Sequence, residues 1–288
     1  RVLFIAYNFP PHGGAGVQRS LKFVKYLPQF GWQPLVVTTT AEASPIQDPT
    51  LLQDIPPHTP ITRIPGFSIF HLQQQAQKYR LHRLAVLLNV LLQIPDPTRF
   101  WAKKIQPTLD DLIRQHQPEL IYTTSGPYSA HLAGRWLRQR TNLPWLADFR
   151  DPWSQNLLMP YAPGYRALNA RLERQVLTTA DKITCVSRPW LNDLQQNLGH
   201  SPGKFTVLPN GYDETDLETS PLPASGERFI LTHIGSFYRN RRPDELIQAV
   251  EQLVAHGRVP AEKLLIRFIG KNAQRFAPDH PSFEAIDY

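Results

Sequence analysis

The chain has 288 residues, enough for one large α/β domain and part of a second. Its 41% hydrophobic and 19% charged content excludes a disordered protein, and its single cysteine excludes an internal disulfide. The net charge is +7, and all of the excess lies at or before Asp216, where 22 Lys and Arg face 15 Asp and Glu. This charge favours an anionic partner, such as a phosphate ligand, an acidic lipid surface or nucleic acid.

Short β-branched runs alternate with helical patterns, which predicts an α/β fold with a parallel sheet and crossover helices. The expected strands are 2–6, 35–39, 61–64, 120–124, 145–148, 182–186 and 205–208. The expected helices are 17–30, 79–93, 102–115, 128–140, 165–179 and 189–198.

Residues 209–226 are rich in Pro, Gly, Ser and acids and lack periodicity, so they are interpreted as a linker. The pattern then restarts with an expected strand at 229–234, a helix at 243–256 and a strand at 264–269. One strand–helix–strand unit cannot bury both faces of its sheet, so we expect only the beginning of a second domain. The predicted domains are 1–213 and 228–288, joined by a linker at 214–227.

A glycine-rich loop, Pro10–Val17, joins the first strand to the first helix. Gly13, Gly14 and Gly16 would let the backbone approach an anion at the helix N-terminus. The loop is neither a dinucleotide fingerprint, because Arg19 replaces a small residue, nor a Walker loop. A plain strand-to-helix turn is an equally good interpretation. His12 in this loop is a candidate on the acceptor side, although a histidine without a role is the simpler interpretation.

A second motif, Asp148-Phe149-Arg150-Asp151-Pro152-Trp153, follows the strand at 145–148. Ligands collect beyond the carboxyl ends of parallel strands. Asp148, Arg150 and Asp151 are therefore candidate catalytic residues, and Trp153 could stack on a sugar. The alternative is an Asp–Arg ion pair that braces the loop.

Two further motifs occupy similar positions. Ser125 begins a strand-to-helix loop and is a weak acceptor-side candidate, because a helix cap explains it equally well. Arg239 and Arg241 follow the strand at 229–234 and could clamp a diphosphate, unless they form a solvated basic loop.

Residues 78–104 hold six Lys and Arg against one acid, Asp96, and an apolar helical stripe. This combination suggests contact with an anionic membrane surface, although most amphipathic helices pack on their own domain. The longest apolar run, 84–92, is too short to cross a bilayer, and no secretory signal is apparent. We therefore expect a cytoplasmic location, with peripheral attachment to the inner membrane face as an option.

In this order the motifs resemble the family-four retaining glycosyltransferases of the GT-B fold. The resemblance rests on the opening Tyr7–Arg19, Phe30–Trp32, Leu143–Trp153, Thr179–Asp181 and Leu208–Asp213, and it spans nearly the whole chain. It implies two Rossmann-like domains and transfer of a sugar from a nucleotide-diphosphate sugar, with the glycine loop facing the donor diphosphate. Asn210 and Asp213 would form the hinge that closes the first domain.

The sequence also differs from the family's pattern at two positions. Arg150 replaces a histidine found in many relatives, and Ser236 replaces an arginine that binds phosphate. Arg239 or Arg241 could supply the lost charge. The family's paired glutamates would lie beyond Tyr288, so we expect this stretch alone to turn over little substrate.

The acceptor class suggested by the resemblance is an envelope glycan or a lipid-linked sugar. No tightly bound cofactor and no metal are expected, because the nucleotide-diphosphate sugar would bind as a substrate. Two alternatives remain: an inactive carbohydrate- or membrane-binding module, and a sugar-nucleotide epimerase of the same architecture. Nucleic-acid binding is less favoured, because aromatic residues are not interleaved with the basic ones.

Overall fold

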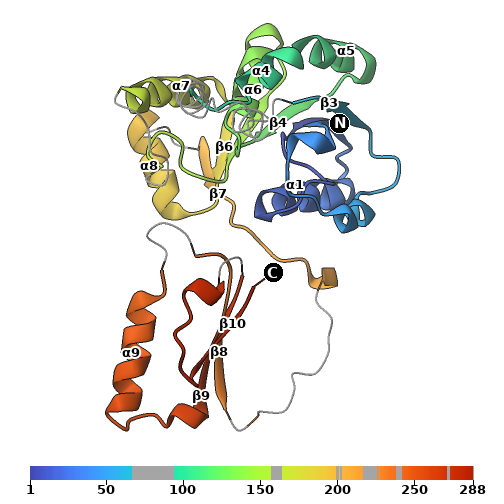
Figure 1. The fold of residues 1–288 in the computed structure, drawn as a ribbon. Coiled ribbons are helices and arrows are strands. Elements are labelled where there is room, and N and C mark those ends of the chain that lie inside the picture. Colours follow the sequence, from blue (N-terminus) through green and yellow to red (C-terminus); the bar gives the residue numbers. More distant parts are fainter. Residues whose placement is uncertain are drawn as a thin grey trace, which may run out of the picture. The chain divides into compact units, whose positions relative to one another are not determined.

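The computed structural model describes residues 1–66, 94–156, 164–198, 201, 203–216, 226, 228–237, 242–270 and 273–287. It divides into two compact units, Arg1–Asp216 and Leu217–Tyr288 (Figure 1). The first unit ends at Asp216, somewhat beyond the domain boundary expected at Asp213, because the segment after Asp213 is hydrogen-bonded to helix α1 (Ala15–Tyr26). Each unit is described by itself.

Unit 1 is built on a parallel sheet in the order β3-β2-β1-β4-β5-β6-β7. The order reverses direction between β1 and β4, which is where open α/β sheets place their ligands. The strands are β1 (Val2–Ile5), β2 (Pro34–Thr39), β3 (Ile61–Ile64), β4 (Leu120–Thr124), β5 (Trp145–Phe149), β6 (Lys182–Cys185) and β7 (Phe205–Val207). The α/β fold expected from the sequence is confirmed.

Helices cover both faces of this sheet (Figure 1). Alternate residues of β1 point to opposite faces, so Val2 and Phe4 pack with helix α1 while Leu3 and Ile5 join the larger core on the other side. The helices are α1 (Ala15–Tyr26), α4 (Arg99–Lys104), α5 (Gln106–His116), α6 (Ser129–Arg140), α7 (Tyr165–Thr179) and α8 (Arg188–Leu198). Cys185 is buried in this larger core, as expected for a small apolar residue.

The helix expected at 102–115 is in fact two helices, α4 and α5, which meet at Ile105. Pro107 lies in the first turn of α5 and has no N–H to continue the hydrogen-bond ladder, so the chain breaks there. The first helix also ends earlier than expected and continues as a short 3-10 helix, Leu27–Phe30. The helix expected at 79–93 lies outside the described residues.

Unit 2 has a parallel sheet in the order β10-β9-β8, with β8 (Phe229–Ile234), β9 (Leu264–Ile269) and β10 (Phe283–Ile286). Helix α9 (Asp244–Ala255) packs on this sheet through Val250, which belongs to the same core as Phe268. Strand β10 was not expected, because its four residues include Glu284 and give too short an apolar pattern.

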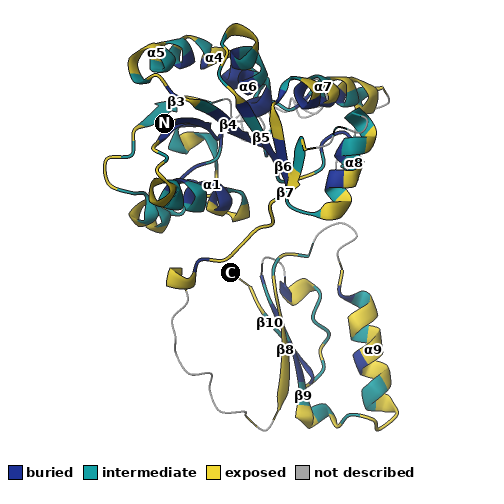
Figure 2. Cartoon of the chain, turned by 180° about the vertical axis from the view of Figure 1, so that it is seen from behind, coloured by how far each residue is buried: buried dark blue, intermediate teal, exposed yellow. Residues whose placement is uncertain are grey.

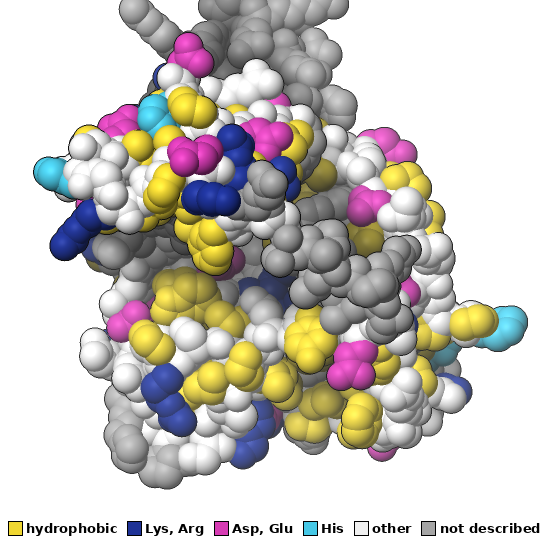
Figure 3. Space-filling view, turned by 90° about the horizontal axis from the view of Figure 1, so that it is seen from below, with side chains coloured by type: hydrophobic (Ala, Val, Ile, Leu, Met, Phe, Trp, Pro, Cys, Tyr) yellow, Lys and Arg dark blue, Asp and Glu magenta, His cyan; other side chains and the backbone are white. Residues whose placement is uncertain are grey.

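Strand β8 is exposed along its whole length, although its sequence is mostly apolar (Figure 2). Phe229 is 69% exposed and Ile234 is 73% exposed. In the space-filling view of Figure 3, hydrophobic side chains also lie at the surface among charged ones. One helix and three strands therefore bury the sheet of unit 2 only in part.

Within the described part of the chain, the search for a helix both long and apolar enough to cross a membrane finds none.

Candidate functional site at the carboxyl edge of the first sheet

Three loops meet at the carboxyl ends of β1, β4 and β5. The Asn8 side-chain amide donates a hydrogen bond to the Gly126 carbonyl at 2.9 Å, which joins the first loop to the second. The backbone N–H of Arg150 donates to Ser125 Oγ at 2.9 Å, which joins the second loop to the third. Ser125, a predicted acceptor-side residue, is fully buried and holds these loops together.

The Arg150 guanidinium lies at the centre of these loops. It donates to the carbonyl of Ser125 at 2.5 Å, to that of Gly126 at 3.0 Å, and to that of Gly16 in the first turn of α1. Burial lowers the pKa of Arg150, and it makes no ion pair with a carboxylate among the described residues. A partly buried positive charge without a direct counter-ion among the described residues therefore lies beside the N-terminus of α1, itself the positive end of a helix dipole.

Two of the glycines in these loops leave room for Arg150. A Cβ atom on Gly16 would lie 3.1 Å from Arg150 Nη1, and one on Gly126 would lie 2.9 Å from Nη2. Gly14 differs, because its φ of +94° is strained for other residues while the space around it is open. Gly14 is therefore the glycine of this loop whose backbone conformation favours glycine and whose surroundings leave room for a ligand.

Gly13 and His12 face the protein rather than open space. A Cβ on Gly13 would meet Ile46 at 3.1 Å, and the Gly13 N–H donates to the Ile46 carbonyl at 3.0 Å. His12 is buried, its Nε2 lies 3.0 Å from the Thr40 carbonyl oxygen, and burial lowers its pKa. Both residues therefore fix the loop against the segment that follows β2.

Asp148 is fully buried and forms an ion pair with Arg19 of α1, at 2.8 Å and 3.0 Å. Its oxygens also accept hydrogen bonds from the hydroxyl groups of Thr124 and Thr184, at 2.9 Å and 2.7 Å. Burial alone would raise the pKa of Asp148, but the Arg19 guanidinium and these hydroxyls lower it. Asp148 therefore forms a bracing ion pair, as considered from the sequence, but with Arg19 and not with Arg150. Its contacts hold the loops in position.

Arg19 also holds the chain where it leaves β7. Its guanidinium donates to the carbonyls of Leu208 at 2.9 Å and Pro209 at 3.0 Å, and to Asn210 Oδ1 at 3.2 Å. The predicted hinge residue Asn210 is thus tied to the same ion pair as Asp148. This role of Arg19 was not predicted from the sequence, although Arg19 follows the glycine loop by one helical turn.

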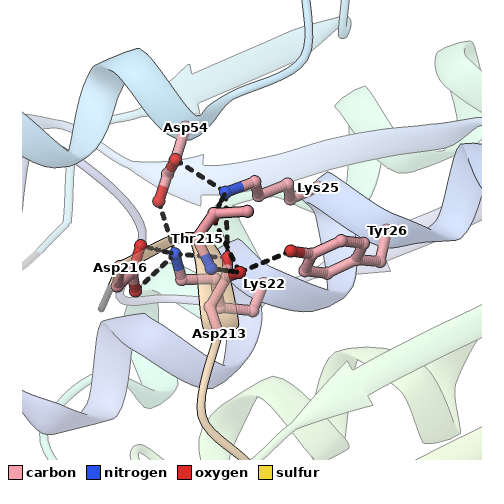
Figure 4. Close-up of polar contacts among 7 residues, drawn as sticks. All are labelled: Lys22, Lys25, Tyr26, Asp54, Asp213, Thr215 and Asp216. Carbon is pink, nitrogen blue, oxygen red and sulfur yellow. Dashed lines mark hydrogen bonds and ion pairs between the residues drawn. The ribbon is translucent and has the colours of Figure 1, made fainter. Parts of the chain in front are cut away.

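The second predicted hinge residue, Asp213, is the centre of a polar cluster on α1 (Figure 4). It accepts hydrogen bonds from Tyr26 at 2.6 Å and Lys25 at 2.9 Å, and it lies 2.8 Å from Lys22 Nζ. These partners hold the pKa of Asp213 well below its usual range, and the hydrogen bond from Lys22 has the largest effect. The cluster fixes the end of unit 1 to its first helix.

The same cluster contains a set of carboxylates that could hold a cation. The oxygens of Asp54, Asp213 and Asp216 lie within 4.8 Å of one another. The Lys22 ammonium lies 2.6 Å from Asp54 and 2.8 Å from each of the other two. Burial alone would lower the pKa of Lys22, but its hydrogen bonds to the carboxylates raise it. The lysine already supplies the positive charge that a metal would bring.

Trp153 is the predicted site residue whose expected role the structure contradicts. It is fully buried, stacks on Tyr128 with ring centroids 5.0 Å apart, and donates from Nε1 to Asn169 at 2.8 Å. Because its ring is fully enclosed and already stacked on Tyr128, it has no open face for a sugar. Asp151, by contrast, is exposed.

The remaining predicted residues lie outside the described part of the chain. They are Arg239, Arg241 and the portion of the basic segment from 78 to 93.

His131 of α6 lies beneath the site and provides a pH-dependent prediction. It is fully buried, its Nδ1 lies 2.7 Å from Thr123 Oγ1, and burial lowers its pKa to about 3. Because the unfolded chain binds this proton below about pH 6.5, stability should fall between pH 6.5 and 3, by at most about 1.4 kcal/mol per pH unit. The unfolding temperature of His131→Asn should fall less between pH 6.5 and 3 than that of the parent. Equal dependence of the two unfolding temperatures on pH would contradict this role of His131.

The glycosyl transferase 4-like domain family matches residues 13–211 of the chain. A search of curated proteins gave no significant match. Among solved structures, sucrose-phosphate synthase from Thermosynechococcus elongatus is similar, with 16% identity, a TM-score of 0.56, and coverage of 95% of this chain and 63% of that one. The chain therefore spans less than two thirds of that protein's length.

Two other solved structures share the fold. A glycosyltransferase from Rickettsia africae has 15% identity and a TM-score of 0.54, with coverage of 99% of this chain and 67% of that one. A UDP-GlcNAc 2-epimerase from Methanocaldococcus jannaschii has 10% identity and a TM-score of 0.52, with 99% and 72% covered. The parallel sheet, its flanking helices and the match over residues 13–211 lead to one conclusion: the chain belongs to the glycosyl transferase 4-like domain family, on a fold of the GT-B type.

Proposed function

We propose that the protein transfers a sugar from a nucleotide-diphosphate sugar to an acceptor, with retention of the anomeric configuration. The observation that carries this proposal is the Arg150 guanidinium, which is partly buried beside the first turn of α1 and has no carboxylate partner among the described residues. In a member of a glycosyltransferase family, such a charge suits a diphosphate group.

In the proposed reaction the bond between the sugar and the diphosphate breaks, and negative charge develops on the leaving diphosphate. Arg150 and the N–H groups at the start of α1 would stabilise that charge, because they are fixed before the reaction begins. Gly14 would let the phosphate approach the backbone, and Gly16 makes room for Arg150. Arg239 and Arg241 are proposed as further phosphate ligands from unit 2.

The acceptor is proposed to be an envelope glycan or a lipid-linked sugar, bound on unit 1 at the cytoplasmic face of a membrane. Asp151 is the exposed acid of the motif after β5 and is proposed to face the reacting groups. Asp148 is proposed to act indirectly, by holding Arg19 and the loop that carries Arg150.

Transfer and epimerisation can be separated with the full-length protein, although both occur on this fold. A transferase should release nucleoside diphosphate only when an acceptor is present. Isomerisation of the sugar nucleotide without an acceptor would instead establish an epimerase and overturn the proposal.

The glycine loop gives a second test. Gly14→Val should lower turnover on the order of 100-fold or more, because a branched side chain at φ +94° displaces the backbone that would contact the phosphate. Gly164→Val is the matched control, since Gly164 also precedes a helix, has φ +81° and faces open space. Equal turnover by the two variants would contradict the role of the loop.

A further inference from the structure

A pocket lies among the helices on one side of unit 1, and its lining is separate from the three loops of the candidate site. Its volume is about 500 Å³, within the range of small-molecule sites. Its lining comes from residues 94–106, from helix α6 and from Leu172 of α7. None of the described residues that line it belongs to the glycine loop or to the motif after β5.

Three basic side chains line this pocket: Arg99 and Lys103 of α4, and Arg135 of α6. The residues found to line it include no Asp or Glu, and none of the three forms an ion pair with a described carboxylate. The positive charges of these three side chains are therefore not neutralised by an ion pair within the described ranges.

The acid nearest in sequence, Asp96, forms no ion pair with these three residues among the described contacts. Asp96 accepts hydrogen bonds from the hydroxyl and N–H of Thr98, at 2.6 Å and 3.0 Å. It also accepts from the hydroxyl and N–H of Ser129, at 2.7 Å and 2.9 Å, and so caps the start of α6. Its oxygens are thus engaged in holding α6 in place.

The rest of the lining is apolar and aromatic. Phe100 is 48% exposed, and the Arg99 guanidinium lies 4.9 Å from its ring centroid. Trp136 and Leu132 of α6 line the same pocket. Aromatic rings beside Lys and Arg are typical of surfaces that lie at the membrane–water boundary, where one part of the ligand is charged and the next is apolar.

We propose that this pocket binds the phosphate headgroup of an anionic phospholipid and holds unit 1 at a membrane surface. Arg99, Lys103 and Arg135 would bind the phosphate, while Phe100, Trp136 and Leu132 would contact the glycerol and the first acyl carbons. A pocket that sets apolar and aromatic side chains beside its basic ones suits a lipid better than the open basic groove that tracks a nucleic-acid backbone. The inference does not depend on the transfer reaction.

The experiment is co-sedimentation of the full chain with mixed phosphatidylcholine–phosphatidylglycerol vesicles, compared with pure phosphatidylcholine vesicles. The parent should bind the anionic vesicles selectively. A triple variant, Arg99→Gln, Lys103→Gln and Arg135→Gln, should bind them on the order of a hundredfold more weakly, from roughly fivefold for each basic residue lost. The double variant that keeps Arg135 shows an intermediate loss and serves if the triple variant does not fold.

The control is a second triple variant, Arg114→Gln, Lys182→Gln and Arg258→Gln, which removes the same charge at exposed positions outside the pocket. It should bind within about threefold of the parent, since its basic residues do not line the pocket. Equal losses in the two triple variants would overturn the proposal, because binding would then follow net charge. Equal binding of the parent to both kinds of vesicle, or its displacement from anionic vesicles by a single-stranded oligonucleotide, would also overturn it.

Discussion

Replacing Asp148 by alanine is expected to lower the free energy of unfolding by about 3–5 kcal/mol, the range found when one partner of a buried ion pair is removed. The variant leaves the Arg19 guanidinium buried without its carboxylate, and the hydroxyl groups of Thr124 and Thr184 lose their acceptor. Urea unfolding followed by circular dichroism measures the change.

Asp151→Ala is the matched control, because Asp151 lies in the same motif but is exposed. Its unfolding free energy should stay within about 0.5 kcal/mol of the parent, as is usual for surface substitutions. If Asp148→Ala costs no more than this control, the ion pair with Arg19 does not hold the loops together.

Replacing Arg150 by methionine is expected to lower kcat/KM about 10²- to 10³-fold, the effect of losing one fixed group that stabilises developing negative charge. Methionine keeps much of the side-chain length but loses the charge and the hydrogen bonds to Ser125, Gly126 and Gly16. Steady-state kinetics of the full-length protein, normalised to folded protein, measure the change. Arg150→Lys should recover only part of the rate, because an ammonium cannot bond all three carbonyls in the same geometry.

Arg138→Met provides the control for this prediction. Arg138 forms an ion pair with Asp181 at 2.8 Å, and Asp181 accepts from the Trp145 N–H at the opposite end of β5. The control therefore makes the same change of charge on helix α6, near the start of β5 and away from the carboxyl edge of the sheet. Similar losses of kcat/KM in the two variants would show that the effect of Arg150 is one of stability.

Strands β1, β2 and β4 were predictable because each is a short, mostly buried run that contains β-branched residues. The place of the site was predictable as well, since loops after parallel strands share one edge of the sheet. The break between α4 and α5 and strand β10 were missed: one depends on a single proline, and the other has only four residues.

Side-chain partners within the site were harder to predict. Asp148 and Arg150 are two residues apart, which suggested that they pair. Asp148 lies within β5 and Arg150 lies beyond its end, so the two side chains have different hydrogen-bond partners. Trp153 follows a strand end as a sugar-stacking residue would, yet the stacked Tyr128 and the amide of Asn169 enclose it. Such partners lie many residues away in sequence, so local patterns do not specify them.

The measurement that tests the central claim most directly is release of nucleoside diphosphate by the full-length protein across a panel of nucleotide sugars. Each donor is incubated with and without extracts of lipid-linked sugars and envelope glycans, and Arg150→Met is assayed in parallel. We predict release from at least one donor, only with an acceptor, and a large loss in the variant. Release from no donor with any extract would contradict the assignment as a transferase, and equal release by the Arg150 variant would contradict the proposed diphosphate site.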